Sequence, residues 1–193
     1  MISAAVICQN EEMYIAKCLN QLWWVDEIVV VDGGSRDNTI PILRKMKTSM
    51  NLKIFQNLFK DHFGDQKNLA ISLTTGDWVM VFDVDEEIEL DLVEELKTIA
   101  IRDNIYDAVA IPRKNYLDDE PTNVYPDYQY RFFRSYCRYI YPVHEELVGY
   151  RNLYTATNHL LHYKTGDRYA FQQNFYERVK LIKNRMRLPH EEW

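Results

Sequence analysis

The sequence lacks the features of a secreted, disulfide-bonded or membrane-spanning chain. Its three cysteines, Cys8, Cys18 and Cys137, form no CxxC pair, and an odd number fits reduced thiols better than a disulfide framework. No apolar run is long enough to span a bilayer. The N-terminus enters a strand-like run without the basic start and cleavage site of a signal peptide. These absences predict a soluble, cytoplasmic protein.

Basic residues are scarce relative to acidic ones. The 23 Lys and Arg against 29 Asp and Glu give a formal net charge of -6. Phosphate contacts need clustered Lys and Arg, so the charge argues against nucleic acid as the main partner. Repeats, low-complexity tracts and an obvious linker are also lacking. We therefore expect a single compact domain over 1–193, with parts at 1–105, 106–167 and 168–193.

The first part alternates between strands and helices. The apolar and amphipathic segments predict strands at 2–8, 26–34, 52–57 and 76–85, and helices at 11–22, 37–48, 65–73 and 90–100. Asn10 stands where it could cap the first helix. This alternation predicts a doubly wound, mostly parallel sheet, which binds ligands at the carboxyl ends of its strands. Three polar loops should therefore converge on one edge: 8–11, 32–35 and 83–85.

The second part has a different pattern. It predicts a smaller region of antiparallel or mixed strands at 108–117, 128–135, 138–148 and 156–165. Many of the chain's 14 Tyr lie here. Because Tyr is both apolar and hydrogen-bonding, these residues indicate either a binding cleft or a Tyr-rich core, and the sequence leaves both open.

A basic amphipathic helix is expected to close the chain at 168–188. It carries basic and apolar residues side by side: Arg178, Lys180, Lys183, Arg185 and Arg187 with Phe171, Phe175, Val179, Ile182 and Met186. Such a helix can lie peripherally on an anionic membrane. Packing on the domain with a solvated basic face is the alternative, and oligomerisation is a third.

The stretch VMVFDVDEE (79–87) places four carboxylates directly after a buried strand. Carboxylates so close together repel one another unless a positive charge compensates them. If the chain turns here, Asp83 and Asp85 can serve one hard cation such as Mg²⁺ or Mn²⁺. The alternative is a solvated acidic start to the next helix. That is our expectation for Glu86 and Glu87 of this stretch and for Glu89 and Asp91 after it.

At this point the chain resembles the GT-A glycosyltransferases of family 2, especially the bacterial lipopolysaccharide-core glucosyltransferase branch. The matching segments span about 2–165: AAVICQNEE, DEIVVVDGGSRDNT, FGDQKNLAI, GDWVMVFDVDEE, and PVHEEL followed by HLLHY. The resemblance implies transfer of a hexose, first of all glucose, from a UDP-sugar to a hydroxyl acceptor such as a glycan or lipid-linked saccharide. It also implies that 1–105 binds the donor and 106–167 the acceptor.

The resemblance implies a set of nucleotide-sugar-binding residues. Asp32 would hydrogen-bond the base. The other donor-side positions would be Cys8, Gln9, Asn10, Glu11, Gly33, Gly34, Ser35, Gln66, Lys67, Asn68, Asp83 and Val84. The glycine pair also permits close approach of a ligand to the backbone. The alternative is that Gly33, Gly34 and Ser35 form an ordinary strand-to-helix turn with a serine cap.

The resemblance also implies the metal and catalytic residues. Asp85 would bind Mn²⁺ or Mg²⁺ directly, Asp83 would reach the ribose or a metal-bound water, and His162 would be a further ligand. Glu145 would be the general base of an inverting transfer, with Glu146 as second choice. Tyr141 and His144 would face the acceptor.

Other functions fit the sequence less well. A sugar-nucleotide nucleotidyltransferase would carry a GxGTR-like loop after its first strand, where this chain has CQNEE. A haloacid-dehalogenase-type phosphatase would place its DxD near the first strand. A non-catalytic nucleotide-binding relative remains an alternative. The chain lacks the QxxRW motif of processive synthases, and Gly33 stands where many family members have a second Asp.

Overall fold

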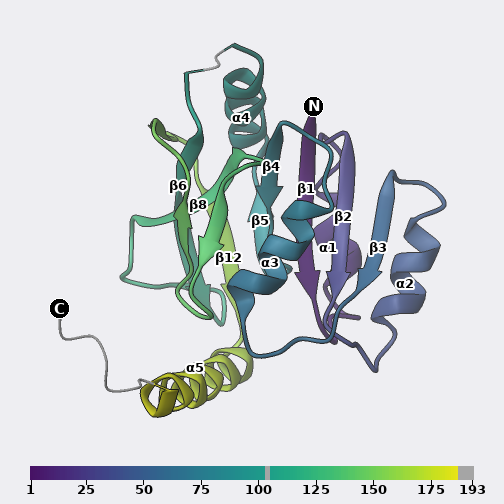
Figure 1. Ribbon diagram of the computed structural model, residues 1–193, viewed down its shortest axis with the longest axis vertical. Coiled ribbons are helices and arrows are strands. Elements are labelled where there is room, and N and C mark those ends of the chain that lie inside the picture. Colours follow the sequence, from purple (N-terminus) through teal and green to yellow (C-terminus); the bar gives the residue numbers. More distant parts are fainter. Residues whose placement is uncertain (103–104, 187–193) are drawn as a thin grey trace.

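The computed structural model describes residues 1–102 and 105–186, and its first four strands are parallel neighbours (Figure 1). In the order β3-β2-β1-β4 they are β3 (Leu52–Gln56), β2 (Glu27–Asp32), β1 (Ile2–Cys8) and β4 (Trp78–Val81). Cys8 lies opposite Asp32, which lies opposite Gln56. β1, β2 and β3 therefore end level with one another, while β4 ends opposite Ala5, and the expected parallel sheet is confirmed.

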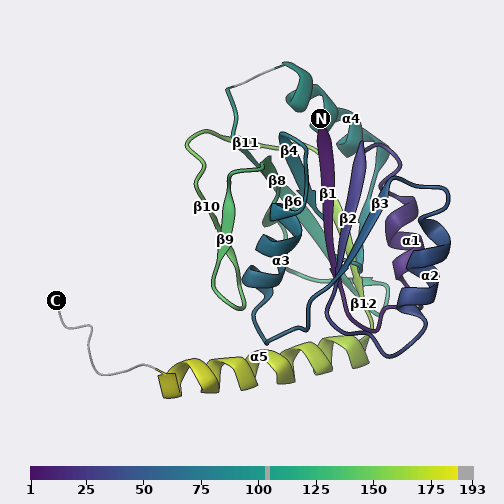
Figure 2. The same ribbon diagram turned by 45° about the vertical axis from the view of Figure 1, so that its right-hand side comes forward.

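Helices cover both faces of this sheet, because alternate strand residues point to opposite faces. Ala4 and Val6 pack with one set of helices, α1 (Ile15–Asn20), α2 (Thr39–Met46) and α4 (Leu90–Arg102). Ala5 packs on the other face with α3 (Phe63–Ser72) and the hairpin of β9 (Arg138–Ile140) and β10 (Glu146–Val148). Figure 2 shows α3 and the hairpin on one side of the strands, with α1 and α2 on the other.

Two expectations for the first helix were wrong. It begins at Ile15 rather than at residue 11, because the chain between them forms turns. Asn10 has a positive φ of 57°, and its side-chain oxygen accepts a hydrogen bond from the Arg36 amide at 2.8 Å. It therefore joins the first two polar loops instead of capping the helix.

The second half extends the same sheet as a mixed region. After β4 the order continues with β8 (Asp127–Arg134), β6 (Ala108–Leu117), β12 (Leu160–Lys164) and β5 (Glu86–Ile88), while β7 (Glu120–Pro121) and β11 (Leu153–Thr155) pair with β6. The segment 138–148 is a hairpin, not one strand. The core reading of the tyrosines holds for Tyr139, which is buried against Phe133. Tyr125 is 54% exposed, and the binding-cleft reading stays a prediction.

The last helix, α5 (Gly166–Met186), runs along the carboxyl ends of the strands (Figures 1 and 2). Phe175 and Val179 are buried with Val143, which confirms packing on the domain for this part of the helix, while Phe171 is 74% exposed. Several basic and apolar residues of the expected amphipathic helix lie outside the described side chains: Lys180, Ile182, Lys183, Arg185, Met186 and Arg187.

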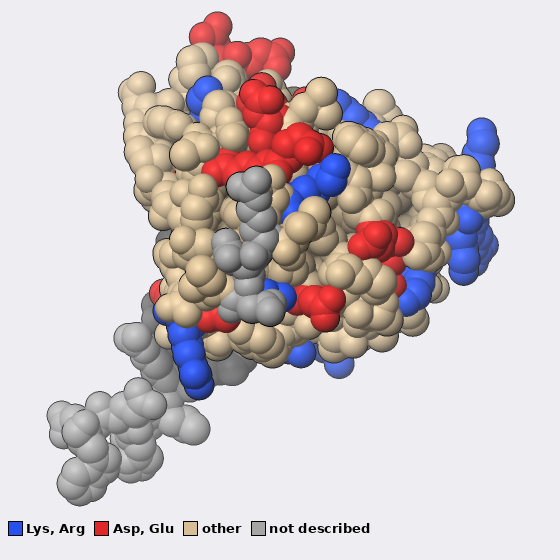
Figure 3. All heavy atoms as spheres, turned by 90° about the horizontal axis from the view of Figure 1, so that it is seen from above, with Lys and Arg blue, Asp and Glu red and all other residues tan. Residues whose placement is uncertain are grey.

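The opposite edge of the sheet carries charged side chains of both signs. Figure 3 shows acidic side chains gathered near the middle of that face, with Lys and Arg scattered around them. Within the described residues, every helix is too short or too polar to cross a bilayer.

Candidate active site

A tight turn brings the two aspartates of the DVD motif to the carboxyl edge. β4 ends at Val81, and the Asp83 amide donates to Glu86 Oε2 at 3.1 Å, while the Glu86 amide donates back to the Asp83 carbonyl at 3.1 Å. The Asp85 carbonyl accepts from the Tyr163 amide on β12 at 3.1 Å. The expected turn therefore exists, and charged groups surround both Asp83 and Asp85.

Glu86 is not part of a solvated helix start, as the sequence suggested. Its side chain is 0% exposed and lies between Arg113 and Arg131, at 3.0 Å and 3.2 Å. A carboxylate buried in this way must be paired, because an isolated charge there would be very costly. The expectation failed because it used only the local sequence, whereas both arginines lie on β6 and β8.

Much of the compensating positive charge comes from the chain itself. Asp83 is paired with Arg131 and with the Lys67 ammonium, which lies 3.5 Å away. Asp85 lies 3.5 Å from the Arg168 guanidinium. Sequence reasoning had no place for the arginines, although Arg113 and Arg131 interrupt apolar strands, and a charged residue in such a strand signals a buried partner.

These contacts keep both aspartates ionised. Burial acts to raise the pKa of the Asp83 carboxyl, but Arg131 and Lys67 outweigh it and hold the pKa below its usual range. Burial likewise opposes ionisation of Asp85, and the contact with His162 outweighs it, lowering the pKa of Asp85 to about 2. The edge therefore presents stable negative charge next to fixed cations.

His162, the expected further metal ligand, lies beside Asp85. The ring is 6% exposed, with Nε2 3.4 Å from the Asp85 carboxylate and Nδ1 2.7 Å from Asn115 Oδ1. The Asn115 amide donates to Asp127 at 2.9 Å, which turns its oxygen toward the ring. Nδ1 is therefore the donor to Asn115, and Nε2 faces the Asp85 carboxylate.

The predicted base, Glu145, joins the same cluster through Lys67. Its Oε1 lies 3.0 Å from the Lys67 ammonium, and the two side chains are 16% and 5% exposed. That oxygen is buried and accepts no well-directed hydrogen bond from the described residues. Glu146, the second choice, is exposed on β10.

The two acceptor-side residues lie on the same connection. Tyr141 and His144 are both exposed and both have positive φ, 73° and 51°. The His144 ring lies 5.1 Å from the Tyr176 ring of α5. Burial raises the pKa of Tyr176 to about 12, so this phenol stays protonated.

Asp32 organises its own loop. It is fully buried, and its carboxylate accepts from the Gly34 and Ser35 amides, at 2.9 Å and 3.0 Å, and from the Ser35 hydroxyl. The resemblance implied that Asp32 contacts the base of the nucleotide. For that contact, the loop at 32–35 would have to open.

Hydrogen bonds from Gln9 and Asn10 join this loop to the loop at 8–11. Gln9 donates to the Gly33 carbonyl at 2.9 Å, and the Asn10 amide donates to the Ser35 hydroxyl at 2.8 Å. A Cβ on Gly33 would lie 3.1 Å from Phe59 Cβ, so this glycine serves close packing in the described structure. Burial, first of all, raises the pKa of the Cys8 thiol, which is therefore unreactive.

Gln66 and Asn68, two of the expected donor-side positions, hold neighbouring segments in place through hydrogen bonds. Gln66 exchanges hydrogen bonds with the Asn57 side chain and carbonyl, at 2.7 Å and 2.8 Å. Asn68 pairs with both backbone groups of Tyr139, at 2.8 Å and 2.9 Å. Lys67 between them faces the carboxylates, whereas Val84 is buried in the core.

Helix α5 adds residues that the sequence analysis missed. Arg168 holds Glu11 through two hydrogen bonds, of 2.9 Å and 2.8 Å, and its guanidinium lies 5.0 Å from the centre of the Tyr14 ring. Burial raises the pKa of Glu11 despite this arginine. Just before the helix, burial lowers the pKa of Lys164, whose ammonium donates to the neutral amide of Gln172.

A parallel sheet of this order, with two aspartates at its carboxyl edge and a mixed region beside it, defines the GT-A glycosyltransferase fold. The structure of Staphylococcus aureus TarS 1-349 in complex with UDP-GlcNAc superposes with a TM-score of 0.70 and 20% identity, covering 94% of this chain and 65% of that one. The chain belongs to glycosyl transferase family 2, whose family model matches residues 3–180.

The chain is also similar to two further proteins. The lipopolysaccharide core biosynthesis glycosyltransferase LpsC of Rhizobium meliloti is 29% identical over 189 residues, covering 93% of this chain and 70% of that protein. The mannosyltransferase PcManGT of Pyrobaculum calidifontis, solved with GDP-Man and Mn²⁺, has a similar fold, with a TM-score of 0.51 and 23% identity, covering 58% of this chain and 35% of that one.

The chain spans only part of several relatives. Two further curated proteins match about half of this chain, which in turn spans 23% and 33% of their lengths. The activity and substrates of the whole protein are therefore treated below as a proposal.

Proposed function

We propose that the chain is the donor-binding and catalytic domain of an inverting glycosyltransferase. It would move a hexose, first of all glucose, from a UDP-sugar to a hydroxyl of a glycan or lipid-linked saccharide. The observation that carries the proposal is the position of Lys67, whose ammonium lies 3.5 Å from Asp83 and 3.0 Å from Glu145. One cation thus joins the donor motif to the candidate base. Family membership supports this reading over a nucleotidyltransferase.

The donor's diphosphate would lie at the carboxyl edge, where Lys67, Arg131, Lys164 and Arg168 provide positive charge. Glu145 would take the proton from the attacking hydroxyl as the bond to the sugar forms on the face opposite the leaving nucleoside diphosphate. Glu145 Oε1 is buried and lies 3.0 Å from the Lys67 ammonium but accepts no well-directed hydrogen bond from the described residues, so it has room to accept one from a substrate hydroxyl.

The residues fit a divalent cation, Mn²⁺ or Mg²⁺, only together with a substrate. Asp85 and His162 would hold it, since their oxygen and nitrogen lie 3.4 Å apart, whereas Asp83 is already paired with cations. Among the described residues, no three His, Cys, Asp or Glu side chains are grouped to hold a metal. Phosphate oxygens and water would supply the other ligands. The ion would stabilise charge on the leaving diphosphate.

The donor assignment is tested by calorimetric titration of UDP, GDP and ADP, first with Mn²⁺ and then with EDTA. Metal-dependent binding of UDP alone is the expected result. If the folded chain binds none of the nucleotides, the donor site is wrongly assigned.

Catalysis is tested by two neighbouring substitutions. Glu145→Gln should retain UDP binding and lower UDP-sugar turnover by roughly 10²–10⁴-fold, the usual contribution of a general base. Glu146→Gln is the matched control and should leave turnover unchanged, because that side chain is exposed. Equal losses in both variants would contradict the assignment. If the parent chain binds UDP but turns over no UDP-sugar, a non-catalytic relative is favoured instead.

Peripheral membrane contact through α5 stays a prediction. Phe171 and Tyr169 are exposed on its first turns, at 74% and 46%. If the helix rests on a membrane, the chain should co-sediment with anionic vesicles, and Phe171→Ser should reduce that fraction. Absence of co-sedimentation would leave α5 as a packing helix.

A further inference from the structure

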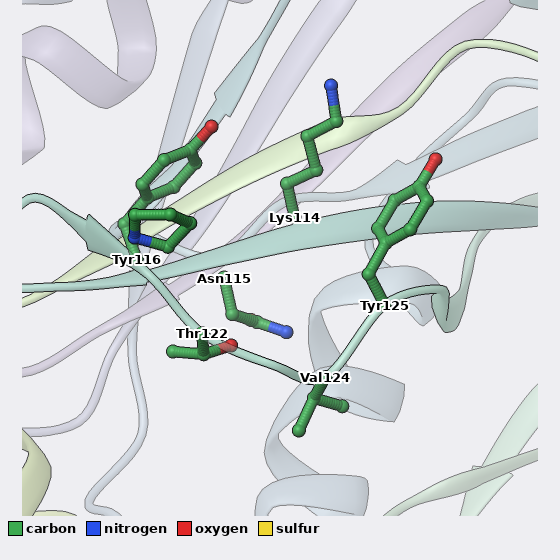
Figure 4. A pocket seen from close by; sticks show the side chains of 7 residues that line it. Lys114, Asn115, Tyr116, Thr122, Val124 and Tyr125 are labelled. Carbon is green, nitrogen blue, oxygen red and sulfur yellow. The ribbon is translucent and has the colours of Figure 1, made fainter.

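A cavity of about 280 Å³ lies between the end of β6 and the segment that follows β7 (Figure 4). We name it the β6–β7 pocket, and its lining residues are Lys114, Asn115, Tyr116, Pro121, Thr122, Val124 and Tyr125. Its volume is near the lower limit for small-molecule sites, about 300 Å³. The pocket is therefore the size for one small ring rather than for a whole nucleotide-sugar.

Two contacts connect the β6–β7 pocket to the candidate active site. Asn115, in the pocket lining, lies 2.7 Å from His162, which lies beside Asp85. The Tyr116 ring stacks on Tyr163 with centroids 4.7 Å apart. A molecule in the pocket would thus lie next to the residues that the proposed reaction uses.

The lining combines aromatic surface with hydrogen-bonding groups. Figure 4 shows the Tyr125 ring and the Lys114 ammonium on the same side of β6, with Thr122 and Asn115 below them. Tyr125 is 54% exposed, and no ion pair holds Lys114 among the described residues. A sugar ring matches this lining, because it has an apolar face of C–H groups and a rim of hydroxyls.

Other ligand classes match less well. A purely apolar ligand would bury the Lys114 and Thr122 polar groups without partners. An anion would meet three carboxylates on the adjoining turn, Asp118, Asp119 and Glu120.

We propose that the β6–β7 pocket binds one uncharged sugar ring of the substrates. This rests on the proposed function, and the ring could come from the donor's hexose or from the acceptor glycan, which share the same chemistry.

The test is saturation-transfer NMR on the full chain with methyl β-D-glucoside and methyl α-D-mannoside, with cyclohexylmethanol as the apolar probe. At least one glycoside should bind. Tyr125→Ala should weaken it roughly fivefold, the loss expected for one aromatic contact. Tyr136→Ala is the matched control, because Tyr136 is equally exposed at 58% but lies beside Asp107, away from the pocket. No glycoside binding, equal binding of the apolar probe, or no effect of Tyr125→Ala would overturn the proposal.

Competition separates the two sources. Displacement of the glycoside by UDP-glucose but not by UDP would assign the pocket to the donor hexose, and binding of both together would assign it to the acceptor. If UDP, which carries no hexose, also displaces the glycoside, the pocket is part of the nucleotide site and the proposal is overturned. Nucleotide binding is measured separately, so a chain that binds UDP but no glycoside refutes only the pocket, and a chain that binds neither refutes both.

Discussion

Glu86→Gln should destabilise the fold strongly, although the sequence around Glu86 looks like an exposed acidic turn. The substitution removes the charge between Arg113 and Arg131, whose side chains are 14% and 7% exposed. It also removes the acceptor for the Asp83 amide. Breaking a buried ion pair from one side usually costs about 3–5 kcal/mol, because the remaining charge stays buried and unpaired.

We expect the lower end of this range, about 3 kcal/mol, because glutamine keeps one oxygen for the arginines. For a chain of this size each kcal/mol lowers the Tm by about 2–4 °C, so the expected shift is about 6–12 °C. Thermal and urea unfolding followed by circular dichroism measure it. Glu87→Gln is the matched control: its side chain is 31% exposed and pairs with Lys17, so about 0–1 kcal/mol is expected.

Equal shifts for the two variants would refute the reasoning, because they would mean that Glu86 behaves as a surface charge. A stabilised Glu86→Gln variant would refute it as well, because repulsion among the carboxylates would then exceed their pairing with arginine.

Three further predictions follow from other contacts. Asp85→Asn should weaken UDP binding with Mn²⁺ at least roughly tenfold, about 1.4 kcal/mol, while changing the Tm less than Glu86→Gln does; calorimetry and thermal unfolding on the same sample decide this. For Glu27, burial opposes ionisation, but hydrogen bonds from Lys53, Ser3 and Thr75 lower the pKa to about 2. Its contribution is thus present above about pH 4.5 and is lost as the pH falls toward 2, and acid unfolding of Glu27→Gln should lack this component. Gly64→Ala should cost about 1–3 kcal/mol and lower turnover, since a Cβ there would lie 2.5 Å from the Tyr141 carbonyl oxygen; unchanged unfolding would contradict this.

Much of the fold follows from local patterns. The consecutive valines of β2 and the apolar run before Asp83 predict buried parallel strands, and parallel strands bring their carboxyl ends to one edge. The DVD motif could therefore be placed at this edge before any coordinates, whereas the HE pair and His162 were assigned to the same site only by the resemblance to family 2. The boundaries of α1 and the split of 138–148 into a hairpin could not, because turns and caps there depend on contacts with distant loops.

The sequence by itself determined the parallel half of the sheet, the family, and the position of Asp83 and Asp85 at the sheet's edge, because side-chain periodicity and short motifs can be read without tertiary contacts. Only the tertiary structure decided how those carboxylates are balanced. Arg131 is 48 residues from Asp83 and 45 from Glu86, and Arg168 is 157 from Glu11. Pairing over such separations depends on strand order and register, so folding converts an apparently exposed acidic turn into a buried ionic network.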